Sequence, residues 1–201
     1  MKKLLMRIFV CFLAVCVVYA AALIADRETL KRELVRLHVV AASDSPEDQA
    51  IKLRVRDAVL ESLRTALQDV TDIEQAKAYI AENLPKIEAA ANQVLAAAGC
   101  GDVAAVSLRV EEFAARVYDT FSLPAGLYDA LRITIGPGEG RNWWCVVFPS
   151  LCVPATSQGF ADVAAGAGFS DGLTDSLTGE YEVRFFLLDL LGQIENYLHR
   201  E

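Results

Sequence analysis

Residues 34–48 read L-V-R-L-H-V-V-A-A-S-D-S-P-E-D and predict the point where a strand gives way to a helix. The first half, residues 34–40, alternates and is rich in β-branched side chains, which is typical of a strand. In the second half, S-P-E-D at 45–48 offers a capping serine, a proline suited to the first helical position and two acids that favour the helix dipole. Apolar residues then recur at helical spacing to about Asp69. The stretch therefore predicts a strand, a polar junction and a long helix.

The chain that follows predicts a mixture of helices and strands. A capping-box pattern at 71–74 opens a second helix, and Pro85 is expected to separate it from an alanine-rich third helix that ends near Ala98. Alternation predicts half-buried strands at 106–110 and 131–135. A further strand is expected at 143–147, ended by F-P-S at 148–150, and a leucine stripe predicts a last helix at 181–200. The predicted class is α+β, with a small antiparallel sheet packed with about four helices.

Residues 34–201 are expected to form one domain, because this length is typical of a single hydrophobic core. One part of it lacks any period. Residues 155–180 are rich in Gly, Ala, Ser, Thr and Asp, which predicts a mobile surface excursion.

The N-terminus carries an export signal. Three cations, Lys2, Lys3 and Arg7, precede eighteen uncharged residues at 8–25. A helix of that length spans about 27 Å, slightly less than a bilayer core, so residues 1–25 are either a cleaved signal peptide or a retained anchor. Small residues at 20–22 fit cleavage after Ala22. An uncleaved chain would contact the membrane through residues 4–25, and residues 26–33 would be a linker.

Charge narrows the range of partners. The formal net charge is −8 and includes the three leader cations, so the exported domain is more acidic still. No cluster of Lys and Arg lies outside the leader, which argues against nucleic acid and anionic lipid as partners.

The cysteines divide by position. Cys11 and Cys16 lie in the leader, and Cys100 has no assigned role. A turn centred on 148–149 would place Cys145 and Cys152 opposite each other in a hairpin, where they either form a disulfide or remain buried thiols. Structural zinc would need a second pair of ligands, so no metal is expected.

Catalytic patterns are sparse. His38, in the first strand, is expected to be a hydrogen-bonded structural residue, and the glycines at 136–140 form a hairpin loop with no phosphate-binding spacing. Acids at a helix start ordinarily serve the dipole, although Asp44, Glu47, Asp48 and Asp57 offer carboxylate pairs for hydrolysis. We therefore expect neither an enzyme nor a cofactor, and keep an exported cell-wall hydrolase using Asp/Glu pairs as the alternative.

Three segments carry a family resemblance. Residues 36–59 (R-L-H-V-V-A-A-S-D-S-P-E-D-Q-A-I-K-L-R-V-R-D-A-V) and 142–152 (N-W-W-C-V-V-F-P-S-L-C) resemble the signatures of stage II sporulation protein R, and residues 123–136 support them. The resemblance implies a protein made in the forespore and exported into the space between the two membranes. It also implies a partner, a membrane-embedded aspartic protease of the mother cell that processes the precursor of an early sigma factor.

The residues of the junction are the first candidates for contact with that protease: Ser43, Asp44 and Asp48, with Arg54 and Arg56 on the helix after them. Trp143 and Trp144 form a second candidate patch, in which at most one side chain is expected in the core because adjacent strand residues face opposite ways. The plainer alternative is that Asp44 and Asp48 are only helix caps. A structural envelope protein without a receptor is a third class of function.

Overall fold

Four strands form the main sheet, and β1 (Val35–Val40) lies inside it. The computed structural model describes residues 1–67, 70–149, 157–166, 169–179 and 183–200. The order across the sheet is β2-β5-β1-β6, with β2 (Ala104–Phe113), β5 (Gly126–Ile135) and β6 (Asn142–Phe148). A second, two-stranded ladder pairs β3 (Arg116–Val117) with β4 (Ser122–Leu123).

One pair of neighbouring strands is parallel, whereas an antiparallel sheet was expected. β1 runs antiparallel to β6 but parallel to β5, so the sheet is mixed. The α+β class is confirmed, whereas the expectation of a wholly antiparallel sheet is wrong, because alternation reports half-burial and not the direction of the neighbour. Two helices and three strands, β2, β3 and β4, lie between β1 and β5 along the chain, which is enough chain for the crossover that a parallel pair requires.

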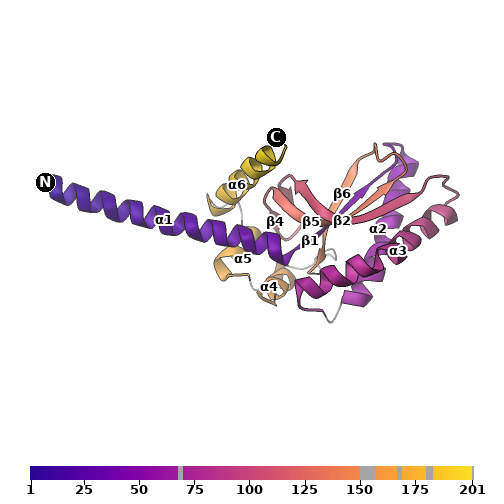
Figure 1. Ribbon diagram of the computed structural model, residues 1–201, viewed down its shortest axis with the longest axis horizontal. Helices are drawn as coiled ribbons and strands as arrows, with labels where there is room; N and C mark the ends of the chain where they lie inside the picture. The colour runs from indigo at the N-terminus through magenta and orange to yellow at the C-terminus, as the bar shows by residue number, and fades with distance from the viewer. Residues whose placement is uncertain (68–69, 150–156, 167–168, 180–182, 201) are drawn as a thin grey trace.

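The helices α2 (Pro46–Leu67) and α3 (Ile73–Ala97) share one hydrophobic core with the sheet (Figure 1). The expected break at Pro85 is wrong, since α3 continues through the proline. An interior proline costs about 3 kcal/mol. Here Ile80 and Ile87 are buried on either side of it, and their packing holds both halves of α3 against the sheet.

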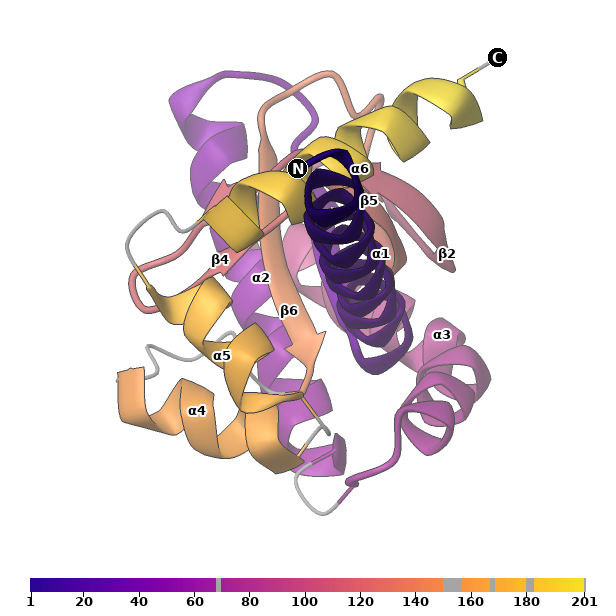
Figure 2. The ribbon, with the colours of Figure 1, turned by 90° about the vertical axis from the view of Figure 1, so that its left-hand side faces the viewer.

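A second helical layer covers part of the other face. It consists of α4 (Ser157–Gly166), α5 (Asp171–Thr178), α6 (Val183–His199) and the end of α1 (Lys2–Glu33) (Figures 1 and 2). The stretch expected as a surface excursion, 155–180, forms two helices where the structure describes it. Its helices are too short to show a period, yet they bury Phe160, Leu173 and Leu177 in the core.

The helix α1 is continuous, and its N-terminal part projects away from the domain (Figure 1). Side chains are exposed up to Ala22, and Leu23 is the first buried residue. Within the described residues, α1 is the one helix long and apolar enough to cross a membrane, with an 18-residue window of mean hydropathy 2.9.

The expected linker at 26–33 is wrong as well, because these residues are helical and packed against α6. Arg184 donates from Nε to Asp26 at 3.0 Å, and Arg27 pairs with Glu195. Lys31 Nζ lies 2.9 Å from the same Glu195 carboxylate. The charged residues Asp26, Arg27 and Lys31 therefore pair with charged residues of α6.

Candidate functional site

The junction between β1 and α2 is held by its own side chains. Ser45 caps α2 by accepting the backbone N–H of Asp48 at 3.1 Å, as expected of that serine. Ser43 accepts the N–H of Ser45 at 3.1 Å and donates its hydroxyl to the Asp48 carboxylate. Asp48 therefore holds Ser43 in place at the junction, and Asp44 takes no part in these hydrogen bonds.

Asp44 connects the junction to the loop before β6. Its carboxylate accepts the backbone N–H of Arg141 at 2.7 Å and lies 3.5 Å from Nε of the same arginine. Both side chains are exposed, so this ion pair contributes little stability of its own. We name the region around the pair the junction surface. Its exposed residues are Asp44, Arg141 and Trp143, and its partly buried residues are Ser43, Asp48 and Arg56.

Gly140 is required by the close approach of the same loop. Its N–H donates to the carbonyl of Ala41 at 3.0 Å, and a Cβ would lie 2.2 Å from the carbonyl oxygen of Ser43. Gly140→Ala is expected to displace the loop and lower the free energy of unfolding by about 1–2 kcal/mol, because a loop can move more easily than a core. Urea unfolding measures this change. Gly101→Ala, where a Cβ meets nothing within 4 Å, is the control, and equal midpoints would contradict the prediction.

Lys52 lies beneath the junction surface, and the sequence interpretation missed it. Only 4% of it is exposed, and its ammonium donates to Gln49 Oε1 at 2.6 Å and to the carbonyl of Arg141 at 2.9 Å. Burial, and then the positive charge of Arg141, lower the pKa of Lys52. The available signal was its position beside Ile51 on the apolar stripe of α2, where a lysine needs buried oxygen partners.

Arg56 and Trp143 meet at the edge of the same surface. The guanidinium carbon of Arg56 lies 4.3 Å from the centre of the Trp143 ring, within the range of a cation–π contact. Trp143 keeps 37% of its surface exposed. Arg54 is exposed two residues away, which places it about 200° around the helix from Arg56. The structure thus brings five of the predicted contact residues into one region and leaves Arg54 outside it.

Trp144 faces the other side of the sheet, so the predicted tryptophan patch is divided between two surfaces. Its ring stacks on His38 with centroids 5.6 Å apart, and the Arg116 guanidinium lies 3.7 Å above it. Trp143 borders α2, and Trp144 stacks on a histidine that belongs to a polar group of side chains on the sheet.

That group, the sheet-face cluster, comprises His38, Arg109, Glu111, Arg132 and Asn142. His38 Nδ1 lies 2.7 Å from Glu111 Oε2, and its Nε2 lies 2.8 Å from Asn142 Oδ1. Burial alone would raise the pKa of Glu111. Hydrogen bonds from His38 and Arg109, with the charge of Arg132, lower it to about 2. His38 is hydrogen-bonded as expected, and its carboxylate partner was not foreseen.

The described residues offer little for metal or hydrolytic chemistry. Among them, no three His, Cys, Asp or Glu side chains gather as metal ligands would. Two hollows, of about 370 and 700 Å³, lie beside β2 and beside the β3–β4 ladder. Their linings contain one carboxylate each, Glu112 and Asp119, so neither offers the paired acids that glycoside hydrolysis requires.

The disulfide remains a prediction. Cys145 is buried in β6 on the side of α2 and α3, while Cys152 lies outside the described residues. Cys100 is partly exposed, with its Sγ 3.9 Å from Asp102 Oδ2.

The fold and its surfaces define a class of protein: an α+β domain that follows an apolar N-terminal helix and carries charged and aromatic side chains at its surface. The family model of stage II sporulation protein R matches residues 31–158. The chain therefore belongs to the stage II sporulation protein R family, a family of sporulation proteins.

A curated relative agrees. Stage II sporulation protein R of Bacillus subtilis (strain 168) is 40% identical over 129 residues, which cover 64% of this chain and 58% of that protein. The chain thus matches less than two thirds of its relative's length. No solved structure matches the chain significantly. The family match contains the junction surface and the sheet-face cluster, while most of α1 and all of α5 and α6 lie outside it.

Proposed function

We propose that this protein is an exported sporulation signal that is made in the forespore and activates a membrane-embedded aspartic protease of the mother cell. The protease then processes the precursor of an early mother-cell sigma factor. Membership of the family supports a role in sporulation. The apolar helix α1, which suits a signal peptide or an anchor, supports export into the space between the two membranes.

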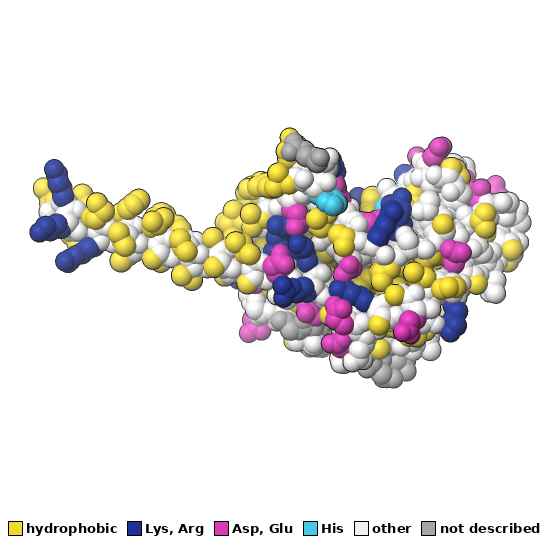
Figure 3. Space-filling view, viewed as in Figure 1, with side chains coloured by type: hydrophobic (Ala, Val, Ile, Leu, Met, Phe, Trp, Pro, Cys, Tyr) yellow, Lys and Arg dark blue, Asp and Glu magenta, His cyan; other side chains and the backbone are white. Residues whose placement is uncertain are grey.

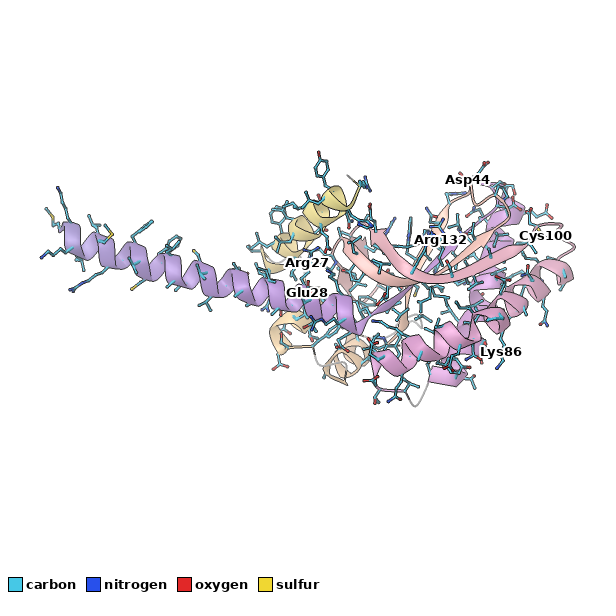
Figure 4. All side chains as sticks on the ribbon, viewed as in Figure 1. Arg27, Glu28, Asp44, Lys86, Cys100 and Arg132 are labelled. Carbon is cyan, nitrogen blue, oxygen red and sulfur yellow. The ribbon has the colours of Figure 1, made fainter. Side chains whose placement is uncertain are left out.

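The observation that carries the proposal is the position of the junction surface relative to α1. Figure 4 places Arg27 and Glu28 where α1 joins the domain, and Asp44 toward the opposite end of the molecule. A chain anchored by α1 in one membrane would therefore direct the junction surface away from that membrane. A receptor in the facing membrane would meet this end of the domain first.

Arg56 and Trp143 are the strongest candidates for the contact itself. Tryptophan and arginine are enriched among residues that dominate binding energy, and here a half-buried Arg56 supports an exposed Trp143 ring. Activation requires that the protein bind the active arrangement of the protease more tightly than the inactive one. The Arg56–Trp143 pair and the Asp44–Arg141 pair would supply that difference in affinity.

The test is co-expression of the full chain with the protease and its sigma-factor precursor. We expect precursor cleavage to rise with the unaltered chain and to fall with Trp143→Ala, since loss of a dominant contact weakens binding by about 30-fold. The readout is the ratio of cleaved to uncleaved precursor on an immunoblot. Substitution of Asp44 or Asp48 is less informative, because both shape the junction.

Val110→Ala is the matched control, since Val110 is an exposed apolar residue on β2. Each variant is checked for folding by circular dichroism. Absence of cleavage with the unaltered chain would reject the signalling function. Full cleavage with a folded Trp143→Ala variant would reject only the assigned contact.

A further inference from the structure

The helix α6 is apolar on two opposite sides. Its inner side packs on the sheet through Phe185, Leu188 and Gly192. Its outer side carries large exposed apolar residues at helical spacing, which we name the α6 outer stripe: Val183, Phe186, Leu190, Ile194 and Tyr197. A surface helix ordinarily turns polar side chains outward, so this stripe indicates that α6 has a further contact surface to cover.

The helix α6 lies on the side of the domain from which α1 projects. Figure 2, which views the molecule from the side of the N-terminus, shows α6 together with α4 and α5 on the face from which α1 emerges. In Figure 3 the apolar side chains of α1 extend up to those over α6. When the apolar segment of α1 enters a membrane, α6 therefore lies next to the surface of that membrane.

Ion pairs connect the packed end of α1 to α6. The helix α1 has no break between its exposed apolar segment and its packed end. Arg27 and Lys31 on that end both pair with Glu195 of α6, and Arg184 of α6 pairs with Asp26. Because no flexible linker intervenes, insertion of α1 into a bilayer would fix α6 close to the lipid headgroups.

We propose that the α6 outer stripe lies on the phospholipid surface that α1 enters. Phenylalanine, tyrosine and branched aliphatic side chains are the types that an interfacial helix places at the boundary between headgroups and acyl chains. The contact rests on apolar burial, in keeping with the acidic charge of the chain. It goes beyond the proposed function, because it requires neither the protease nor signalling.

The test uses the full chain reconstituted in phosphatidylcholine vesicles. The photoreactive residue benzoylphenylalanine replaces Phe186, which is 55% exposed, in one variant and Ile194 in a second. We expect both positions to form covalent adducts with lipid on illumination, detected by mass spectrometry. The substitutions are on exposed positions, so they leave the core unchanged.

Val103 is the matched control, because it is an exposed apolar residue close to Cys100, which Figure 4 shows at the end of the domain away from α1. The lipid adduct yield at Phe186 and Ile194 is expected to exceed that at Val103 several-fold. Equal yields at all three positions would overturn the proposal. Adducts to a second copy of the chain in place of lipid would also overturn it, and would assign the stripe to a dimer interface. Loss of the signalling function would change none of these yields.

Discussion

Replacing Gly192 with alanine is expected to lower the free energy of unfolding by about 3 kcal/mol, at the upper end of the usual cost of overpacking. A Cβ at this position would lie 1.6 Å from the carbonyl oxygen of Ala125 and 2.3 Å from its carbonyl carbon. These are backbone atoms, so no side-chain rotation relieves the clash. The helix α6 must move away from the start of β5, which removes the hydrogen bond of 2.9 Å from the Ala125 N–H to Asp189.

The measurement is urea unfolding of the full chain in mild detergent, followed by circular dichroism. Alanine is a better helix former than glycine by about 1 kcal/mol, so intrinsic propensity alone predicts the opposite sign. Gly101→Ala is the control, because its added Cβ meets nothing within 4 Å. A Gly192→Ala variant as stable as the unaltered chain would show that α6 is not packed this closely on the sheet.

The parts of the fold that sequence predicted are those with a local cause. Ser45 caps α2 as expected, and α3 starts one residue later than its capping-box pattern implies, because Asp72 in place of Thr71 accepts the N–H of Gln75 at 2.9 Å. The strands β2 and β5 follow from alternation, which each strand carries within itself, and β6 was recognised as a short apolar run that ends at Pro149. Capping and alternation need only neighbouring residues, so one sequence is enough to recognise them.

The parts that were not predicted depend on distant residues. Parallel pairing of β1 with β5 joins segments separated by two helices and three strands. The helices α4 and α5 are stabilised by Phe160 and Leu173, whose partners lie in α1 and the sheet. Pro85 shows the same limit, because tertiary packing overrides a local signal to stop.

The candidate site follows the same division. Ser43, Asp44 and Asp48 were recognised because they surround a helix start. Arg141 was not, because its partner Asp44 is 97 residues away. The pair of His38 and Glu111 is separated by 73 residues, and a lone histidine in a strand gives no sign of which carboxylate will face it.

Glu111→Gln is expected to remove about 3 kcal/mol of stability at neutral pH. The pKa of the Glu111 carboxyl falls from its ordinary value of 4.5 to about 2 in the folded protein. Each unit of pKa corresponds to about 1.4 kcal/mol. Since the folded pKa is lowered, the charge contributes fully above pH 4.5, and its contribution declines as the pH falls toward 2. The glutamine variant lacks this contribution at every pH.

The stability gap between the two chains should therefore be widest at neutral pH and narrow as acid protonates Glu111. Urea unfolding at about pH 7 and about pH 3 measures it. Glu112→Gln is the matched control, because Glu112 is the next residue and pairs with the exposed Arg200, an interaction worth less than about 1 kcal/mol. If the Glu111→Gln gap were the same at both pH values, shape and neutral hydrogen bonds would account for the loss. A narrowing gap assigns it to the charge that His38, Arg109 and Arg132 surround on the open face of the sheet.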